Sequence, residues 1–187
     1  MPKFKLIAGL GNPGKEYEGT RHNIGFSVLD RLLCGVEWKN EAGCLRSEIR
    51  IAGEKVVLIK PSTFMNRSGE PLLAAMNYYK YTASDVVIIH DDIDLELGVL
   101  RIREGGSDGG QKGVRSIITS LDTPNFVRIR MGVGRPSNLQ MEISDWVLQK
   151  FSKEESVVLE KMIEKATQSI EVLFQDGVVV AQQKFSN

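Results

Sequence analysis

Short apolar runs alternate with amphipathic stretches along most of the chain. The apolar runs predict strands at residues 4–10, 47–51, 55–59, 86–90, 99–103 and 127–133, with the turn of a hairpin at residues 52–54. Apolar positions at helical spacing predict helices at residues 24–33, 114–121 and 152–174. A further helix is predicted from Ser68, acting as its capping residue, to about Tyr79, with Pro71 in the first turn.

This succession of strands and helices indicates an α/β fold. We expect a single domain over residues 1–187, with a twisted, mixed but mostly parallel sheet and helices on both faces. The chain is long enough for one real core, and no repeat or linker divides it. In such folds the loops after the carboxyl ends of the strands usually carry the functional site.

The composition is that of an ordinary water-soluble globular protein, with 42% hydrophobic and 26% charged residues. No apolar run approaches the roughly 20 residues that a membrane-spanning helix needs. Cys34 and Cys44 lie ten residues apart, a spacing that favours neither a zinc site nor a disulfide framework. We therefore expect a cytoplasmic protein that does not bind membranes.

The formal net charge is zero, so any nucleic-acid partner must be held by a local patch. Residues 99–135 contain seven Lys and Arg but only three Asp and Glu. Arg101 and Arg103 share one face of a predicted strand, and Arg128 and Arg130 share one face of another. These arginines, with Lys112 and Arg115 nearby, predict a platform for phosphates. The alternative is a set of surface arginines paired with acids.

Three motifs suggest chemistry that the sequence does not favour. Residues 9–14 match the dinucleotide pattern G-x-G-x-x-G, but Pro13 and the polar residues after it delay the helix that should meet the phosphates. Residues 105–109 match G-x-S-x-G, but both histidines precede Ser107, which is the wrong order for that nucleophile. The acids Asp91, Asp92 and Asp94 can bind Mg²⁺, although aspartates after a strand more often form turns or pair with cations.

One constellation of residues does favour hydrolysis. His22, on a polar loop after the glycine-rich turn, can take a proton from water, and Asp91 can fix its tautomer. Asn12 and Asn66 can orient the water or stabilise an oxyanion without adding charge. Such a set can hydrolyse an activated ester without a metal or a covalent nucleophile. The alternatives are a capping or loop role for His22 and a loop turn for Asn66, and for His90 a structural role in the core is favoured.

These residues closely resemble the bacterial peptidyl-tRNA hydrolases. The matching segments keep the order and spacing of that family over essentially the whole chain: residues 9–14, Tyr17, Thr20-Arg21-His22-Asn23, residues 60–69, His90-Asp91-Asp92 and the loop at residues 105–113. The resemblance implies a single α/β domain, usually monomeric, without a metal, another cofactor or a protein partner. It also implies that the substrate is peptidyl-tRNA, whose ester between the peptide and the 3′ ribose of tRNA is hydrolysed.

The resemblance also implies roles for particular residues. His22 corresponds to the general base, Asp91 to its partner, and Asn12 and Asn66 to substrate-positioning or transition-state donors. Residues that correspond to the peptide cleft are Tyr17, Phe64 and Met65, and those that correspond to tRNA-phosphate contacts are Arg103 and Arg130. Lys112 is a departure, because the family usually has Gly-Gly-His-Asn-Gly where this chain has Gly109-Gly110-Gln111-Lys112-Gly113. The usual Asn is linked to tRNA binding and water positioning, whereas a lysine keeps a donor, loses the amide acceptor and adds a charge.

Two alternatives to this enzyme remain. Some relatives of the family act in organelle RNA splicing as binding proteins, which would need the arginines but neither His22 nor Asp91. A metal-dependent phosphodiesterase would instead use Asp91, Asp92 and Asp94. Because both His22 and Asp91 are present, the sequence favours the hydrolase.

Overall fold

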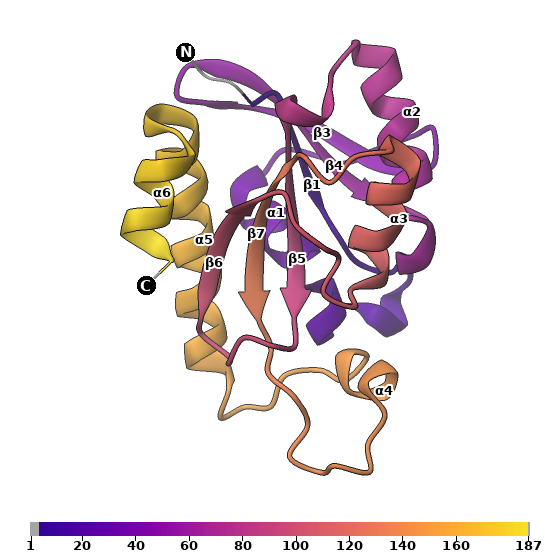
Figure 1. Cartoon of the computed structure of the whole chain (residues 1–187), viewed down its shortest axis with the longest axis vertical. Helices are drawn as coiled ribbons and strands as arrows, with labels where there is room; N and C mark the ends of the chain where they lie inside the picture. The colour runs from indigo at the N-terminus through magenta and orange to yellow at the C-terminus, as the bar shows by residue number, and fades with distance from the viewer. Residues whose placement is uncertain (1–3, 187) are drawn as a thin grey trace.

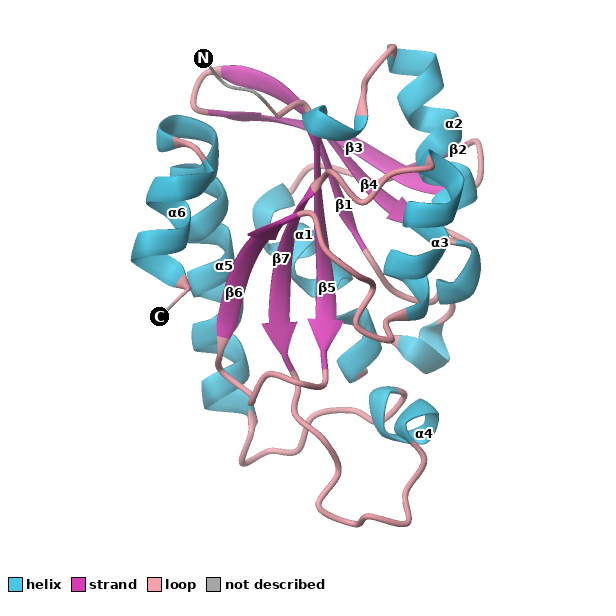
Figure 2. Ribbon diagram, in the orientation of Figure 1, coloured by secondary structure: helices cyan, strands magenta, loops and turns pink. Residues whose placement is uncertain are grey.

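A seven-stranded sheet forms the centre of the computed structural model, which describes residues 4–186 (Figures 1 and 2). The strand order is β2-β3-β4-β1-β5-β7-β6. The neighbours within β4-β1-β5-β7 are parallel, whereas β2-β3, β3-β4 and β7-β6 are antiparallel, so half of the six pairings are parallel. The predicted mixed sheet is thus confirmed, with its parallel strands at the centre. The strands are β1 (Leu6–Gly9), β2 (Lys39–Glu41), β3 (Cys44–Ile51), β4 (Glu54–Pro61), β5 (Val86–Asp92), β6 (Leu100–Glu104) and β7 (Val127–Gly132).

Helices cover both faces of the sheet, as predicted. The helices are α1 (Ile24–Leu33), α2 (Gly69–Tyr79), α3 (Lys112–Leu121), α4 (Ile143–Val147), α5 (Ser156–Asp176) and α6 (Val178–Phe185). On one face Leu6 and Ile88 pack with Val114 in a core that α2 and α3 cover. On the other, Ile7 and Ile170 belong to the core under α1, α5 and α6 (Figure 1). Successive residues of the central strands therefore enter opposite cores, which explains why these strands read as continuous apolar runs.

The helix after β4 begins differently from the prediction. Ser68 already has helical backbone angles (φ −61°, ψ −24°), and its hydroxyl donates to the carbonyl oxygen of Met65 at 2.9 Å rather than accepting from the helix. The prediction that Ser68 caps α2 with its side chain is therefore wrong. A short 3₁₀ helix, η3 (Met65–Arg67), precedes α2 and supplies the carbonyl that holds this hydroxyl. This hydrogen bond ties the start of α2 to the segment that carries Met65 and Asn66.

The amino end of α1 packs directly on the backbone of the central strands. A Cβ atom at Gly25 would lie 2.5 Å from both the carbonyl oxygen of Ile89 and the amide nitrogen of Leu10. A Cβ atom at Gly9 would lie 2.4 Å from the carbonyl oxygen of Gly25. Only glycine permits this approach, which places the short 3₁₀ helix η2 (Arg21–Asn23) over the carboxyl ends of β1 and β5.

We expect Gly25→Ala to destabilise the protein, because the added methyl group must push α1 away from both strands. Overpacking of this kind costs roughly 1–3 kcal/mol, and here we expect at least about 2 kcal/mol. Urea unfolding monitored by circular dichroism measures the change. Ser27→Ala, two residues further along the same helix, is the control and should stay within about 0.5 kcal/mol of the wild type. Equal stability of the two variants would contradict the close packing at Gly25.

Candidate active site

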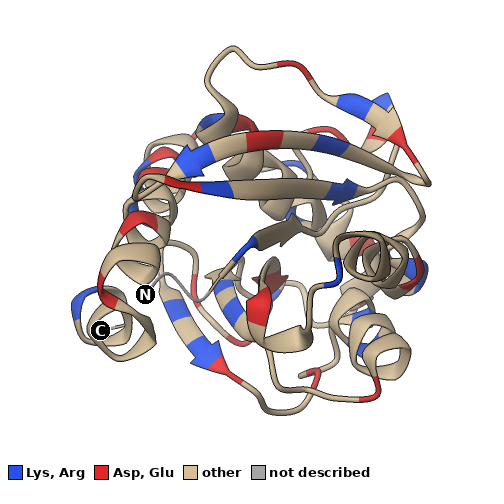
Figure 3. Cartoon of the chain, turned by 90° about the horizontal axis from the view of Figure 1, so that it is seen from above, with Lys and Arg blue, Asp and Glu red and all other residues tan. Residues whose placement is uncertain are grey.

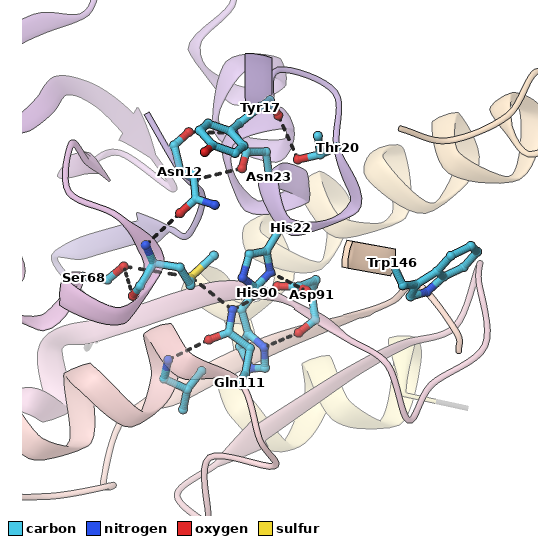
Figure 4. A network of polar contacts seen from close by, with 12 residues as sticks. Asn12, Tyr17, Thr20, His22, Asn23, Ser68, His90, Asp91, Gln111 and Trp146 are labelled. Carbon is cyan, nitrogen blue, oxygen red and sulfur yellow. Dashed lines mark hydrogen bonds and ion pairs between the residues drawn. The ribbon is translucent and has the colours of Figure 1, made fainter. Parts of the chain in front are cut away.

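His22 and Asp91 face each other at the carboxyl end of the sheet (Figure 4). His22 comes from η2, between β1 and α1, and Asp91 is the penultimate residue of β5. Nδ1 of His22 lies 2.8 Å from Oδ2 of Asp91, whose side chain is only 2% exposed. With the Nδ1 proton donated to this carboxylate, Nε2 is the nitrogen left with a free lone pair.

Gln111 holds the other oxygen of Asp91. Its Nε2 donates to Oδ1 of Asp91 at 2.9 Å, while its Oε1 accepts from the backbone N–H of Val114 at 2.8 Å and so caps α3 (Figure 4). Burial alone would raise the pKa of Asp91, but the charge and hydrogen bond of His22 and the hydrogen bond of Gln111 outweigh it and hold that pKa below its usual range. Asp91 is therefore an oriented carboxylate that stays ionised at neutral pH.

Three hydrogen bonds, to Met65 and Asn23, fix the position of Asn12. Its Oδ1 accepts from the backbone N–H of Met65 at 2.7 Å. Its own backbone N–H donates to Oδ1 of Asn23 at 2.9 Å, and Nδ2 of Asn23 donates back to the Asn12 carbonyl at 2.9 Å. Because the amide oxygen is used in this way, the NH₂ group of Asn12 is the part left to act as a donor.

A cleft of about 630 Å³ brings the predicted site residues together. Its walls include the three predicted cleft residues, the four predicted catalytic residues and Lys112: Asn12, Tyr17, His22, Phe64, Met65, Asn66, Asp91 and Lys112. Phe64 is 57% exposed and meets the ring of Tyr17 edge to face, with 6.3 Å between the centroids. Asn66 is exposed, and its side chain has no hydrogen bond to the rest of residues 4–186. The cleft thus has an apolar wall beside a set of polar groups.

The far wall of the cleft comes from α4 and its flanks, which the sequence did not predict. The lining residues there are Glu142, Ile143, Ser144, Val147 and Leu148. Arg21 directly precedes His22 in the chain and connects this wall to η2, which carries His22. Its guanidinium lies 3.8 Å from the centroid of the Trp146 ring and pairs with Glu155 at 2.9 Å. The cation–π contact with Trp146 therefore holds α4 against η2, and the ion pair with Glu155 joins Arg21 to the start of α5.

The predicted arginine platform is only partly available to phosphates. Arg101 lies opposite Arg130, and Arg103 opposite Arg128, on one face of the β6–β7 ribbon. Arg128, however, is only 3% exposed, because its guanidinium donates to the carbonyls of Gly105 and Ser107 in the glycine-rich loop. Its predicted place in the platform is therefore wrong.

The remaining arginines of the platform differ in whether they form an ion pair with a carboxylate. Arg130 pairs with Asp92 at 2.7 Å. Arg101 and Arg103 are exposed and have no ion pair with any carboxylate of the described chain. Figure 3 shows that charges of both signs are spread over the molecule. The excess of positive charge at this ribbon is therefore local.

The acidic residues after β5 are engaged by arginines. Asp92 holds Arg130, and Asp94 holds Arg135 at 2.6 Å. Within residues 4–186, no three His, Cys, Asp or Glu side chains gather in the arrangement of metal ligands. The Mg²⁺ alternative thus has no preformed ligand set in this part of the chain.

Two residues of the site carried no clear signal in the sequence. Gln111 stands in the sequence only as one residue of a glycine-rich segment, yet its side chain orients Asp91. Asn23 is only one residue of the Thr20-Arg21-His22-Asn23 motif in the sequence, yet its side chain holds the backbone of Asn12. The available signal was position: Gln111 directly precedes a predicted helix, and Asn23 directly follows the candidate base.

Comparison with known proteins identifies the family to which this chain belongs. The family model described as "Peptidyl-tRNA hydrolase" matches residues 6–187. The chain belongs to the peptidyl-tRNA hydrolase family. A peptidyl-tRNA hydrolase of Caldanaerobacter subterraneus is 45% identical over 184 residues, which cover 97% of this chain and 98% of that protein. One of Staphylococcus epidermidis is 47% identical over 172 residues, which cover 90% of each chain.

The solved structures agree with this assignment. The crystal structure of peptidyl-tRNA hydrolase from Acinetobacter baumannii superposes with a TM-score of 0.92 at 35% identity and covers 100% of this chain and 96% of that one. Membership in the peptidyl-tRNA hydrolase family makes the protein a carboxylic ester hydrolase with a role in translation. None of the helices in residues 4–186 is long and apolar enough to cross a membrane.

Proposed function

We propose that this peptidyl-tRNA hydrolase cleaves the ester between a peptide and the 3′ ribose of tRNA with His22 as general base. The observation that carries the proposal is the 2.8 Å contact between His22 Nδ1 and a buried carboxylate, beside a cleft that His22 lines. The proton of a water molecule passes to Nε2 of His22 as its oxygen attacks the ester carbonyl. General-base help of this kind is worth roughly 10²–10⁴ in rate.

Asn12 and Asn66 supply hydrogen bonds in this mechanism. The amide of Asn12 is locked by Met65 and keeps its NH₂ group as a donor, so it suits the fixed oxyanion position. Asn66 is exposed in the cleft, where its free amide suits the first peptide amide of the substrate. A peptide carbonyl accepts from such an amide, whereas a protonated α-amine has only donors. This difference favours peptidyl esters over free aminoacyl esters.

The peptide occupies the apolar wall of the cleft, and the tRNA lies on the β6–β7 ribbon. Tyr17, Phe64 and Met65, which line the cleft, contact the peptide. Arg103 and Arg130 contact phosphates of the acceptor arm, whereas Lys112 lies in the cleft beside the bound ester. These contacts give affinity and salt dependence rather than sequence reading. In this function the chain is one domain and acts as a cytoplasmic monomer without a cofactor.

Arg103→Ala is expected to raise KM and to reduce the salt dependence of tRNA binding, with kcat little changed. Because the Arg103 guanidinium is exposed and unpaired, its loss should lower the slope of log affinity against log salt by about one. Filter binding of uncharged tRNA at several salt concentrations measures the slope. Arg50→Ala, an exposed arginine on β3, is the control. A slope equal to that of the control would remove Arg103 from the phosphate contacts.

One assay tests the proposed function against its alternatives. The purified protein is incubated with N-acetyl-aminoacyl-tRNA and with unblocked aminoacyl-tRNA, each with and without EDTA. We expect rapid release of the N-acetyl amino acid, slow release of the unblocked one, and no effect of EDTA. Tight tRNA binding without any release would instead indicate an RNA-binding protein. Loss of activity in EDTA would indicate metal-dependent chemistry.

A further inference from the structure

Lys112 brings an uncompensated positive charge into the catalytic cleft. It lines the cleft as the first residue of α3, directly after Gln111, whose side chain holds Asp91. The Lys112 side chain is exposed and forms no ion pair or hydrogen bond within residues 4–186. Its ammonium is therefore free to interact with a bound substrate.

None of the other charged groups that line the cleft forms an ion pair with Lys112. Asp91 is engaged by His22 and Gln111, and Asp92 by Arg130. Glu142 stands at the start of α4 and also lines the cleft, but no ion pair joins it to Lys112. A second cation in the cleft would therefore be repelled by the charge of Lys112.

We propose that Lys112 is a specificity-determining residue that disfavours esters with a protonated α-amine. The inference rests on the proposed function and deepens it. The two competing substrates carry the same tRNA, but only the unblocked aminoacyl ester carries an ammonium group next to the scissile carbonyl. The blocked ester presents a neutral amide at the same place. Lys112 thus adds charge repulsion to the hydrogen bonds that favour the peptidyl ester.

The expected size of this effect is modest and measurable. Two unit charges about 8 Å apart in a wet cleft, with an effective dielectric constant of about 40, repel enough to change a rate by about fivefold. The repulsion acts on any ester with a charged α-amine and leaves neutral esters unaffected. It also weakens as pH rises, because an α-amine loses its proton near pH 7.7–8.0.

A matched pair of substrates isolates this effect from all contacts with the tRNA. Alanyl-tRNA and lactyl-tRNA differ only in an α-ammonium against an α-hydroxyl group, so the ratio of their kcat/KM values cancels the shared contacts. We expect Lys112→Met to raise the alanyl-to-lactyl ratio about fivefold at pH 6.5. Lys112→Arg, which keeps the charge, should leave the ratio within about twofold of the wild type.

Two further measurements make the test sharper. Glu142→Gln removes a negative charge from the cleft, so the same ratio should fall in that variant. Between pH 6.5 and 9 the wild-type ratio should rise, and it should rise less in Lys112→Met. His22, Asp91, Asp92 and Tyr17 also face the cleft, but they are the same in the wild type and in Lys112→Met, so the difference between the two pH profiles isolates the charge of Lys112.

The outcomes separate this inference from the proposed function. An unchanged ratio in Lys112→Met, with N-acetylalanyl-tRNA still hydrolysed, would overturn the charge filter and leave the hydrolase intact. Failure of the wild type to hydrolyse N-acetylalanyl-tRNA would overturn the proposed function itself. A raised ratio in Lys112→Met that Lys112→Arg does not share supports the filter.

Discussion

His22→Ala is expected to lower kcat for N-acetyl-aminoacyl-tRNA by at least about 10², while the affinity for tRNA stays the same. The imidazole is the group with a free nitrogen beside the buried carboxylate, and alanine leaves nothing to accept the proton of water. Single-turnover release of the acyl group measures the rate, and filter binding of uncharged tRNA measures the affinity.

The matched control for this prediction is His90→Gln. His90 is buried, and its Nδ1 lies 2.8 Å from the Asp91 carbonyl oxygen, so its replacement should act on stability rather than on the chemical step. Thermal unfolding separates the two effects. Near-normal kcat in folded His22→Ala would remove His22 from the mechanism.

Asp91→Asn is expected to lower kcat by up to about 10⁴, the loss seen when the carboxylate behind a catalytic histidine becomes an amide. The existing network cannot accommodate the new NH₂ group. If the amide oxygen faces His22, the NH₂ group meets the NH₂ group of Gln111; if it faces Gln111, the NH₂ group meets Nδ1 of His22 and imposes the wrong tautomer.

The pH dependence of stability gives a second readout for Asp91→Asn. Because the pKa of Asp91 is held below its usual range, the ionised carboxylate stabilises the fold above the ordinary pH range of a carboxyl group, and this contribution is lost as pH falls. The variant should therefore lose stability at neutral pH and resemble the wild type in acid. Asp92→Asn, whose wild-type side chain pairs with Arg130, is the control for kcat. A kcat of Asp91→Asn within threefold of the wild type would contradict the role of Asp91.

Much of the fold could be predicted from the sequence because its central strands are buried on both sides. Continuous apolar runs predict β1, β4 and β5, whereas β7 is predicted from apolar residues that alternate with Arg128 and Arg130. β2 could not be found in this way, because Lys39-Asn40-Glu41 is exposed and only its pairing with β3 makes it a strand. α4 has only five residues, too few to show a helical period.

The candidate site could be predicted only where topology alone brings residues together. His22 and Asp91 lie 69 positions apart, but each is close to the carboxyl end of one of two adjacent parallel strands, β1 and β5. The role of Gln111 depends on which way an amide side chain turns, which no periodicity encodes. Likewise, the strand period places Arg128 beside Arg130, but it does not reveal that the glycine-rich loop folds over Arg128.

Chemical rescue of His22→Ala tests the central claim most directly. The measurement is the rate at which this variant releases the N-acetyl amino acid from N-acetyl-aminoacyl-tRNA as imidazole is added, with EDTA present throughout. The account predicts a rate that rises with the concentration of unprotonated imidazole, because the cleft of about 630 Å³ admits the missing base beside Asp91. A rate that does not change with imidazole, in a variant that folds and binds tRNA normally, would contradict the claim that an imidazole at this position activates water.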